Sequence, residues 1–354
     1  MFKERGILFI YTETPLHAGS GTSIGTVDLP IQRERHTDYP LIQASGVKGA
    51  LRDLAYQSNK VTKEDRDKFK ELREVEDNKL DDEKRQAKSE LANRILPLEA
   101  VFGPETDRAD EHAGALSLTD ARILLFPVRS LQGVFAWITC PFVLRRFQRD
   151  LALLGQDPGW QLPTLIDEKT ALVTDGSTVK VPDDGVVLEE YHFEAEITGN
   201  QLVAGIAEFL SREVFPSDSA YGYWRERLYK KENDKFETSN LVILSDNAFR
   251  DFVRFSTEVL TRIKIDEEKG TVQSGALWSE EHLPSDTLLY TLALATAPRT
   301  KCDSIKDAKG VLQFLDKLLK DKVKGVAQFG GDETVGRGLV RLSFTGGNAN
   351  EQGG

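Results

Sequence analysis

The fold is decided by residues 6–52, GILFIYTETPLHAGSGTSIGTVDLPIQRERHTDYPLIQASGVKGALR. Residues 6–14 are rich in Ile, Phe, Tyr and Thr, which predicts a strand. Residues 16–30 are rich in glycine and predict a long loop. A short extended segment follows within residues 31–43. The chain then enters a helix, with Ser45 as its expected N-cap.

The rest of the chain continues the mixture of strands and helices. We expect strands within residues 114–128, 133–139, 259–278 and 286–297, and a last strand after the glycine-rich run at 329–338. We expect helices from Pro141, around residues 201–215 and 246–255, and over the amphipathic run 306–321. The order strand, helix, strand, strand, helix, strand predicts an α+β fold with a ferredoxin-like (RRM-related) core.

Three segments are expected to depart from that core. Residues 60–90 are a nearly neutral charge run with few large apolar residues, which predicts an exposed helical insertion that adds little to the core. Residues 173–181, VTDGSTVKV, are typical of a hairpin with Asp175-Gly176 at its turn. Residues 346–354, GGNANEQGG, predict a disordered tail after a single domain over residues 1–345.

The composition favours a cytoplasmic protein and sets a bias against nucleic acid. The chain has 354 residues, with 46 basic and 57 acidic side chains and a net charge of −11. An acidic total argues against phosphate binding, although a local basic groove is compatible with it. No apolar run reaches membrane-span length and no signal peptide is visible, so we expect no membrane partner. Cys140 and Cys302 are too few for a disulfide framework or a four-thiolate zinc site.

The first glycine-rich loop has candidate chemistry at both ends. Gly19, Gly21 and Gly25 do not make a dinucleotide fingerprint or a Walker loop. They allow a phosphate or base to approach the backbone closely, and a loop without a ligand is the alternative. His17 and Asp28 flank the loop, which is compatible with an acid–base or metal site.

The segment SGVKGALR, residues 45–52, favours an anion site. Lys48 stands in the first turn of the expected helix, where the helix dipole disfavours a cation. A bound phosphate would explain it by bridging the ammonium and the helix N-terminus. Arg52 lies one turn further along the same face. The alternative is an ordinary pair of surface cations.

Other side chains carry weaker signals. His112 and His192 stand alone, and no histidine or cysteine cluster indicates a built-in zinc site. Tyr221, Tyr223 and Trp224 lie near two arginines, so they are compatible with base stacking, but core packing is the favoured reading.

Several runs in order resemble a known family. They are LHAGSG and VDLPIQRERHTDYPLIQASGVKGALR, then VFGPE, SGALWSEEHLP and FGGDETVGRGLVRL, spread from residue 16 to residue 342. Together they resemble the RAMP superfamily of CRISPR-associated proteins. Within it, they are most similar to the repeated backbone subunit (the fourth Cmr subunit) of the type III-B Cmr effector complex.

The resemblance implies an architecture and partners. The expectation is a hand-like single RAMP domain with a ferredoxin-like palm and a β-hairpin thumb, for which residues 160–200 are the candidate. Copies are expected to stack along a crRNA as a helical filament with other Cmr subunits. The thumbs are then expected to displace nucleotides of the target single-stranded RNA. The RNA would be cut at regular intervals, with the help of a divalent cation (Mg²⁺ or Mn²⁺), as part of antiviral defence.

The resemblance also implies site residues. The Asp required for cleavage corresponds to Asp28, which would position the attacking 2′-hydroxyl or the metal, and His17 would assist proton transfer. Glu280 matches the second acidic element, and His282 stands where relatives carry a tyrosine. The resemblance, together with the two glycine-rich loops, implies contact with RNA. The residues concerned are Lys48, Arg52, Gly19, Gly21, Gly330, Gly331, Gly336 and Gly338.

Two alternatives stay open at this point. One is a crRNA-binding backbone subunit without catalysis, against which the presence of Asp28 argues. The other is a stand-alone RAMP enzyme that processes precursor crRNA, which usually relies on a metal-independent histidine site and lacks the VDLPIQRE run.

Overall fold

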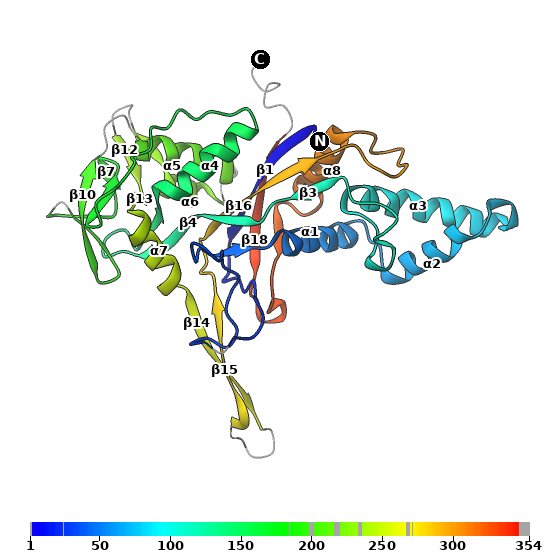
Figure 1. The fold of residues 1–354 in the computed structure, drawn as a ribbon, viewed down its shortest axis with the longest axis horizontal. Helices are drawn as coiled ribbons and strands as arrows, with labels where there is room; N and C mark the ends of the chain where they lie inside the picture. Colours follow the sequence, from blue (N-terminus) through cyan, green and yellow to red (C-terminus); the bar gives the residue numbers. More distant parts are fainter. Residues whose placement is uncertain are drawn as a thin grey trace.

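The structure is a computed structural model that describes residues 2–23, 25–183, 185–197, 202–215, 220–232, 236–266, 270 and 272–346. The fold is α+β, with helices flanking a large sheet (Figure 1). The expected tail, residues 346–354, lies outside the described residues from 347 onward. The helices are α1 (Ala44–Ser58), α2 (Lys63–Glu74), α3 (Asp82–Phe102), α4 (Pro141–Leu153), α5 (Leu202–Val214), α6 (Gly222–Leu228), α7 (Asp246–Phe255) and α8 (Ala308–Lys317).

The strands fall into one large sheet and two small ones. The strands of the large sheet are β1 (Glu4–Thr12), β2 (Leu41–Ile42), β3 (Leu116–Leu118), β4 (Ala121–Arg129), β5 (Phe135–Thr139), β6 (Thr170–Val173), β8 (Lys180–Val181), β9 (Gly185–Leu188), β10 (Tyr191–Ile197), β13 (Leu241–Ile243), β16 (Leu288–Ala295), β17 (Val326–Gln328) and β18 (Leu339–Gly346). The small sheets hold β7 (Gly176–Ser177), β11 (Lys230–Glu232) and β12 (Phe236–Ser239), and β14 (Glu258–Ile265) and β15 (Val272–His282).

The centre of the large sheet is built on β1. This strand pairs antiparallel with β16, with Phe9 opposite Tyr290, and antiparallel with β18 on its other edge. β16 in turn pairs antiparallel with β4. Residues 6–12 are all buried, so β1 is a continuous apolar run rather than an alternating one. The helix α8 packs against β1 and β16 and contributes buried Val311, Leu312 and Leu315.

The expected thumb segment is part of the sheet. Within residues 160–200, β6 pairs with β10 and β13, and β10 pairs with β9. The expected hairpin over residues 173–181 does not form. The hairpin prediction relied on a local turn signal, but β7 pairs with β12 and β8 pairs with the strand that follows it, β9.

A different hairpin extends from the body. β14 and β15 form a two-stranded sheet of their own, with Glu258 opposite His282, and reach away from the large sheet (Figure 1). One face of this hairpin exposes Val259, Ile263 and Leu277. A two-stranded hairpin of this kind needs support at its base.

The charged insertion is helical, as predicted, but it is packed on the body. Helices α2 and α3 project to one side (Figure 1). Thr62 and Asp65 form a capping box at the start of α2. The prediction that the insertion adds little to the hydrophobic core is wrong, because its residues Phe69, Leu72 and Leu80 are buried in that core.

Smaller differences concern element boundaries. Helix α1 begins at Ala44 with Gln43 as its N-cap, two residues before the predicted cap Ser45. The expected strand over 114–128 divides into β3 and β4 at Asp120, where a carboxylate oxygen accepts a hydrogen bond from the Ala44 N–H. None of the helices in the described ranges combines the length and the apolar character that a membrane crossing requires.

Two of the three aromatic side chains pack into the body, as favoured, whereas Tyr223 is exposed. Trp224 Nε1 donates a 3.1 Å hydrogen bond to a carboxylate oxygen of Asp286, and Tyr221 stacks on Phe215. The Arg341 guanidinium lies 4.1 Å from the Tyr221 ring centroid.

Candidate functional site

The glycine-rich loop is laid along β15. Leu16 and Leu283 exchange two backbone hydrogen bonds of 2.9 and 2.8 Å. Further along, the Leu29 N–H donates to the Ser279 carbonyl and the Glu281 N–H donates to the Leu29 carbonyl, both at 3.0 Å. The main chain therefore brings both ends of the loop, and with them His17 and Asp28, to one strand at the base of the hairpin.

Asp28 presents a fixed and ionised carboxylate. One oxygen, Oδ2, accepts hydrogen bonds of 2.8 Å from both the N–H and the hydroxyl of Ser279. These bonds favour the charged form, so they lower the pKa of Asp28 below its ordinary value. The side chain is exposed, and Oδ1 has no hydrogen-bond partner among the described residues. One oxygen thus anchors the carboxylate and the other is available.

His17 is held on the same strand, two residues along. Its Nδ1 lies 2.7 Å from the carbonyl oxygen of Glu281. Its ring is half-buried and its centroid lies 5.4 Å from that of His282. No contact joins His17 to Asp28 in the described part of the chain, so the loop brings the two to one strand without pairing them.

Glu280 and His282 belong to an ion-pair network that also includes Arg262 of β14. Arg262 Nε donates to Glu280 at 2.7 Å and its Nη2 donates to Asp332 at 2.9 Å. His282 Nε2 lies 3.4 Å from the same Asp332 oxygen. The second oxygen of Glu280 accepts a 2.8 Å hydrogen bond from the Trp278 indole N–H. The network joins the two hairpin strands to the C-terminal glycine-rich loop.

This network is a poor match to a divalent-metal site. Ligand atoms of Glu280, His282 and Asp332 do lie within 4.8 Å of one another. However, Arg262 already pairs with both carboxylates, and His282 is fully buried. Burial lowers the pKa of His282, which favours the neutral ring that a metal requires, so the obstacle is the Arg262 charge and the burial rather than protonation of the ring.

Asp28 fits a metal better than the network does. Mg²⁺ is commonly held by one or two carboxylates together with substrate phosphates and water. The exposed Oδ1 of Asp28 offers such a ligand next to open solvent. The expectation that Asp28 is the metal ligand is therefore compatible with the geometry.

Lys48 and Arg52 lie together on α1, one turn apart. Neither has an ion pair or a hydrogen bond among the described residues, and both are partly buried. Burial lowers the pKa of Lys48, and the neighbouring Arg52 charge lowers it further. Two adjacent cations without a counter-ion make a site that an anion would stabilise.

The glycines expected to face RNA have two different reasons to be glycine. A Cβ on Gly330 would stand 2.3 Å from the His17 carbonyl oxygen, and one on Gly338 would stand 2.0 Å from the Phe329 carbonyl oxygen. These two are therefore required by packing within the protein. Gly21 and Gly336 share the positive φ of that pair but face open space. The Gly331 N–H donates to the His17 carbonyl at 3.0 Å.

The residues that hold the site side chains in place were not predicted from the sequence. Ser279 fixes Asp28, and Arg262 and Asp332 hold Glu280 and His282. Asp332 lies within the quoted run FGGDETVGRGLVRL and Ser279 directly precedes Glu280. Arg262 carried no sequence signal, because its partner Asp332 is 70 residues away.

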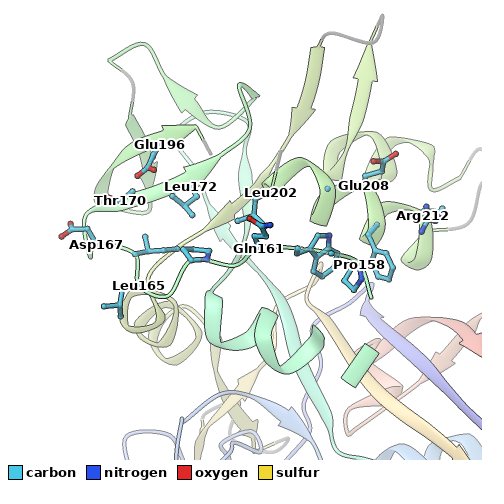
Figure 2. Close-up of a pocket in the computed structure, with 16 residues that line it drawn as sticks. Pro158, Gln161, Leu165, Asp167, Thr170, Leu172, Glu196, Leu202, Glu208 and Arg212 are labelled. Atoms are coloured by element: carbon cyan, nitrogen blue, oxygen red, sulfur yellow. The ribbon is translucent and has the colours of Figure 1, made fainter. Parts of the chain in front are cut away.

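A large cavity lies elsewhere. It has a volume of about 850 Å³ and is lined by the loop around Gln161 and by α5 residues such as Arg212 (Figure 2). None of the predicted site residues lines it. The candidate site is an open edge along β15, which suits an extended ligand better than a small enclosed one.

The chain is similar to proteins of one family along nearly its whole length. Residues 9–341 match the RAMP superfamily. The CRISPR system Cmr endoribonuclease Cmr4 of Pyrococcus furiosus is 39% identical over 337 residues, which cover 95% of this chain and 94% of that protein. The CRISPR system CMR subunit Cmr4 of Saccharolobus solfataricus is 25% identical over 345 residues, 95% of each chain.

Solved structures give the same result. The crystal structure of oligomeric Cmr4 from Pyrococcus furiosus aligns with a TM-score of 0.61 and 29% identity, covering 98% of this chain and 99% of that one. A second crystal structure of Cmr4 aligns with a TM-score of 0.60 and 30% identity. The chain therefore belongs to the RAMP superfamily and, within it, to the family of the CRISPR system Cmr endoribonuclease Cmr4.

Proposed function

We propose that this chain is the repeated, crRNA-binding backbone subunit of a type III-B CRISPR effector complex and that it cleaves guide-paired target RNA. The observation that carries the proposal is the state of Asp28: an exposed, ionised carboxylate, anchored through one oxygen by Ser279, with the other oxygen free. The relatives named as Cmr4 include an endoribonuclease and an oligomeric crystal form, which supports both cleavage and self-association.

The palm and thumb of this subunit are assigned as follows. In chain order, β1, α1, β4, β16, α8 and β18 follow the βαββαβ pattern, and their strands lie in the order β18-β1-β16-β4. That arrangement supports a ferredoxin-like palm within a single RAMP domain. The freestanding hairpin β14–β15 is a better thumb than residues 160–200, because it is not paired with the large sheet.

Cleavage needs the target 2′-hydroxyl activated and the negative charge on the phosphate neutralised. A divalent cation, Mg²⁺ or Mn²⁺, would supply Lewis-acid stabilisation of that phosphate. Asp28 holds either the cation or the 2′-hydroxyl through Oδ1, while Ser279 keeps the carboxylate charged and oriented. Because β15 carries Ser279, the position of Asp28 is tied to the base of the thumb.

The guide backbone is assigned to α1. Lys48 and Arg52 lack counter-ions in the described part of the chain, and RNA phosphates would supply them. The net charge of −11 is compatible with this, because one basic channel is enough for RNA when the remaining surface faces solvent or sister subunits.

The test is cleavage of a labelled target RNA by the complex reconstituted with crRNA and the partner Cmr subunits. Asp28→Asn keeps the shape and removes the charge, so we expect target binding to stay and cleavage to fall by at least about 100-fold. Ser279→Ala removes one of the two anchors and is expected to give an intermediate loss. Chelation of divalent cations should mimic Asp28→Asn.

The matched control is Asp110→Asn, an exposed aspartate outside the site, which should cut at the wild-type rate. If the wild-type complex binds target RNA but never cuts it, the chain is a structural backbone subunit. If Asp28→Asn cuts normally, the proposed role of Asp28 is wrong.

A further inference from the structure

The hydrogen bond at Nδ1 fixes the tautomer of His17. Its partner, the Glu281 carbonyl oxygen, only accepts hydrogen bonds, so at 2.7 Å the proton must lie on Nδ1. In the neutral ring Nε2 then carries the lone pair. Nε2 has no hydrogen-bond partner among the described residues, although it is not sealed from solvent. The ring nitrogen able to accept a proton is thus both defined and unused.

Gly19 is what leaves that nitrogen open. A Cβ on Gly19 would stand 2.7 Å from His17 Nε2, closer than the 3.3 and 3.5 Å to the ring carbons beside it. The Gly19 backbone cannot easily withdraw, because it forms an antiparallel bridge with Ile31 and is flanked by the Gln32 N–H bond to the Ala18 carbonyl at 2.8 Å. The His17 ring cannot easily turn away without breaking its bond to Glu281.

We propose that Gly19 is a positioning residue of the cleavage reaction, which keeps Nε2 of His17 open so that this nitrogen accepts the proton of the target 2′-hydroxyl. The inference rests on the proposed function and assigns to Gly19 a role beyond contact with RNA. The 2′ oxygen forms a bond to the adjacent phosphorus, and the bond from phosphorus to the 5′ oxygen breaks. The leaving 5′ oxygen keeps the electron pair and takes a proton from water, giving a 2′,3′-cyclic phosphate and a 5′-hydroxyl.

His282 does not serve this purpose equally well. Its ring is fully buried, its Nε2 faces Asp332 at 3.4 Å, and its Nδ1 is sealed without a partner. RNA cannot reach either nitrogen without opening the ion-pair network. His17, half-buried at the open edge, is the accessible histidine of the two.

The experiment compares two glycine substitutions in the same loop, each in the reconstituted complex. Gly19→Ala places a methyl group against Nε2, whereas a Cβ on Gly25 meets only the movable Ser23 hydroxyl at 3.2 Å. Under single-turnover conditions we expect Gly19→Ala to slow cleavage by at least about 30-fold, approaching the range for loss of an acid–base group, with target affinity unchanged. Gly25→Ala should cut within about 2-fold of wild type, since surface changes of this kind have small effects.

A second variant separates proton transfer from loop anchoring. His17→Asn retains an N–H near the position of Nδ1, able to reach the Glu281 carbonyl, and lacks Nε2 altogether. It should slow cleavage as much as Gly19→Ala does. The double variant should be no slower than His17→Asn alone, because both changes remove the same proton acceptor.

A spectroscopic measurement tests the tautomer without relying on activity. In the full chain labelled with ¹⁵N-histidine, the neutral ring of His17 should show a protonated Nδ1 and an unprotonated Nε2. Gly19→Ala should perturb the Nε2 signal, and Gly25→Ala should not. A protonated Nε2 in the neutral ring would overturn the assignment.

The kinetic outcomes are distinguishable from failure of the proposed function. If Asp28→Asn abolishes cleavage while Gly19→Ala and His17→Asn cut at the wild-type rate, the nuclease proposal stands and the role of Gly19 is wrong. If the losses of Gly19→Ala and His17→Asn multiply in the double variant, Gly19 acts on something other than Nε2. If Asp28→Asn also cuts normally, the proposed function itself fails.

Discussion

The glycine-rich loop and the charged insertion are both long excursions from the sheet, but different parts of the chain hold them in place. The loop is fixed by its main chain, through the backbone hydrogen bonds of Leu16 and Leu29 to β15. The insertion is fixed by side chains, through ion pairs such as Arg66 with Glu105 and Lys70 with Asp107. It adds a small set of buried apolar residues to these pairs.

This difference decides which side chains remain available for chemistry. A loop held by its backbone leaves the carboxylate of Asp28 and Nε2 of His17 free. A segment held by ion pairs has its charges occupied, as when Glu99, almost fully buried, accepts from both Arg73 and Arg108. We infer that the insertion serves the architecture of the subunit and that the loop serves its reaction.

The largest expected effect comes from the apolar contacts of the insertion. Phe69→Ala removes a ring that is 3% exposed and should lower the free energy of unfolding by about 3–5 kcal/mol. Chemical denaturation of the chain measures it. Lys68→Ala, exposed on the same helix, is the control and should stay within about 0.5 kcal/mol. A loss below about 1 kcal/mol for Phe69→Ala would mean that α2 is only loosely attached.

A smaller effect is expected from the buried carboxylate under the insertion. Glu99→Gln removes one of the two carboxylates that pair with Arg108 and Arg73 and leaves them only Glu111 in the described part of the chain. We expect a loss of about 2 kcal/mol, less than for a fully buried pair because Arg73 is partly exposed. Hydrogen exchange should show faster exchange in α2 and unchanged exchange in residues 16–31. Equal acceleration in both regions would remove the distinction between side-chain and main-chain anchoring.

Much of the fold could be predicted where the local sequence of a segment indicates its secondary structure. The buried run of β1, Pro141 at the start of α4 and the amphipathic face of α8 each predicted the observed element. The pairing between strands could not be predicted in this way. The turn signal at Asp175-Gly176 favoured a hairpin over residues 173–181, but β6 pairs with the distant strands β10 and β13, and β8 pairs with the next strand, β9. A separate two-stranded hairpin formed at β14–β15.

The same distinction applies to the candidate site. Asp28 and His17 were found because they lie within one recognisable run of sequence. Ser279 and Asp332 were not assigned roles, because their importance depends on contacts with residues 251 and 70 positions away. A motif identifies side chains with chemistry, whereas the groups that hold those side chains are chosen by the tertiary structure.

The finest test of the comparison uses two lysines with opposite environments. Lys70 of the insertion has an acidic partner, Asp107, whose hydrogen bond raises the lysine pKa. Lys48 of α1 has no acidic partner among the residues that the structure describes, and burial together with Arg52 lowers its pKa below 10.5. If Lys48 binds guide phosphate, RNA must raise its pKa, so binding is coupled to proton uptake. Affinity should then fall as pH rises through the pKa of free Lys48, and should not change below it.

A nuclease-resistant 2′-O-methyl RNA guide strand allows this to be measured at alkaline pH. NMR titration of the labelled chain should show the Lys48 pKa rising on addition of the guide and that of Lys70 unchanged. Lys48→Ala should reduce the slope of log affinity against log salt by about 0.7, the value for one contact to single-stranded RNA, whereas Lys70→Ala should leave the slope as it is. Equal slopes for the two variants would make Lys48 an ordinary surface lysine, and unpaired charge on α1 would then need another explanation.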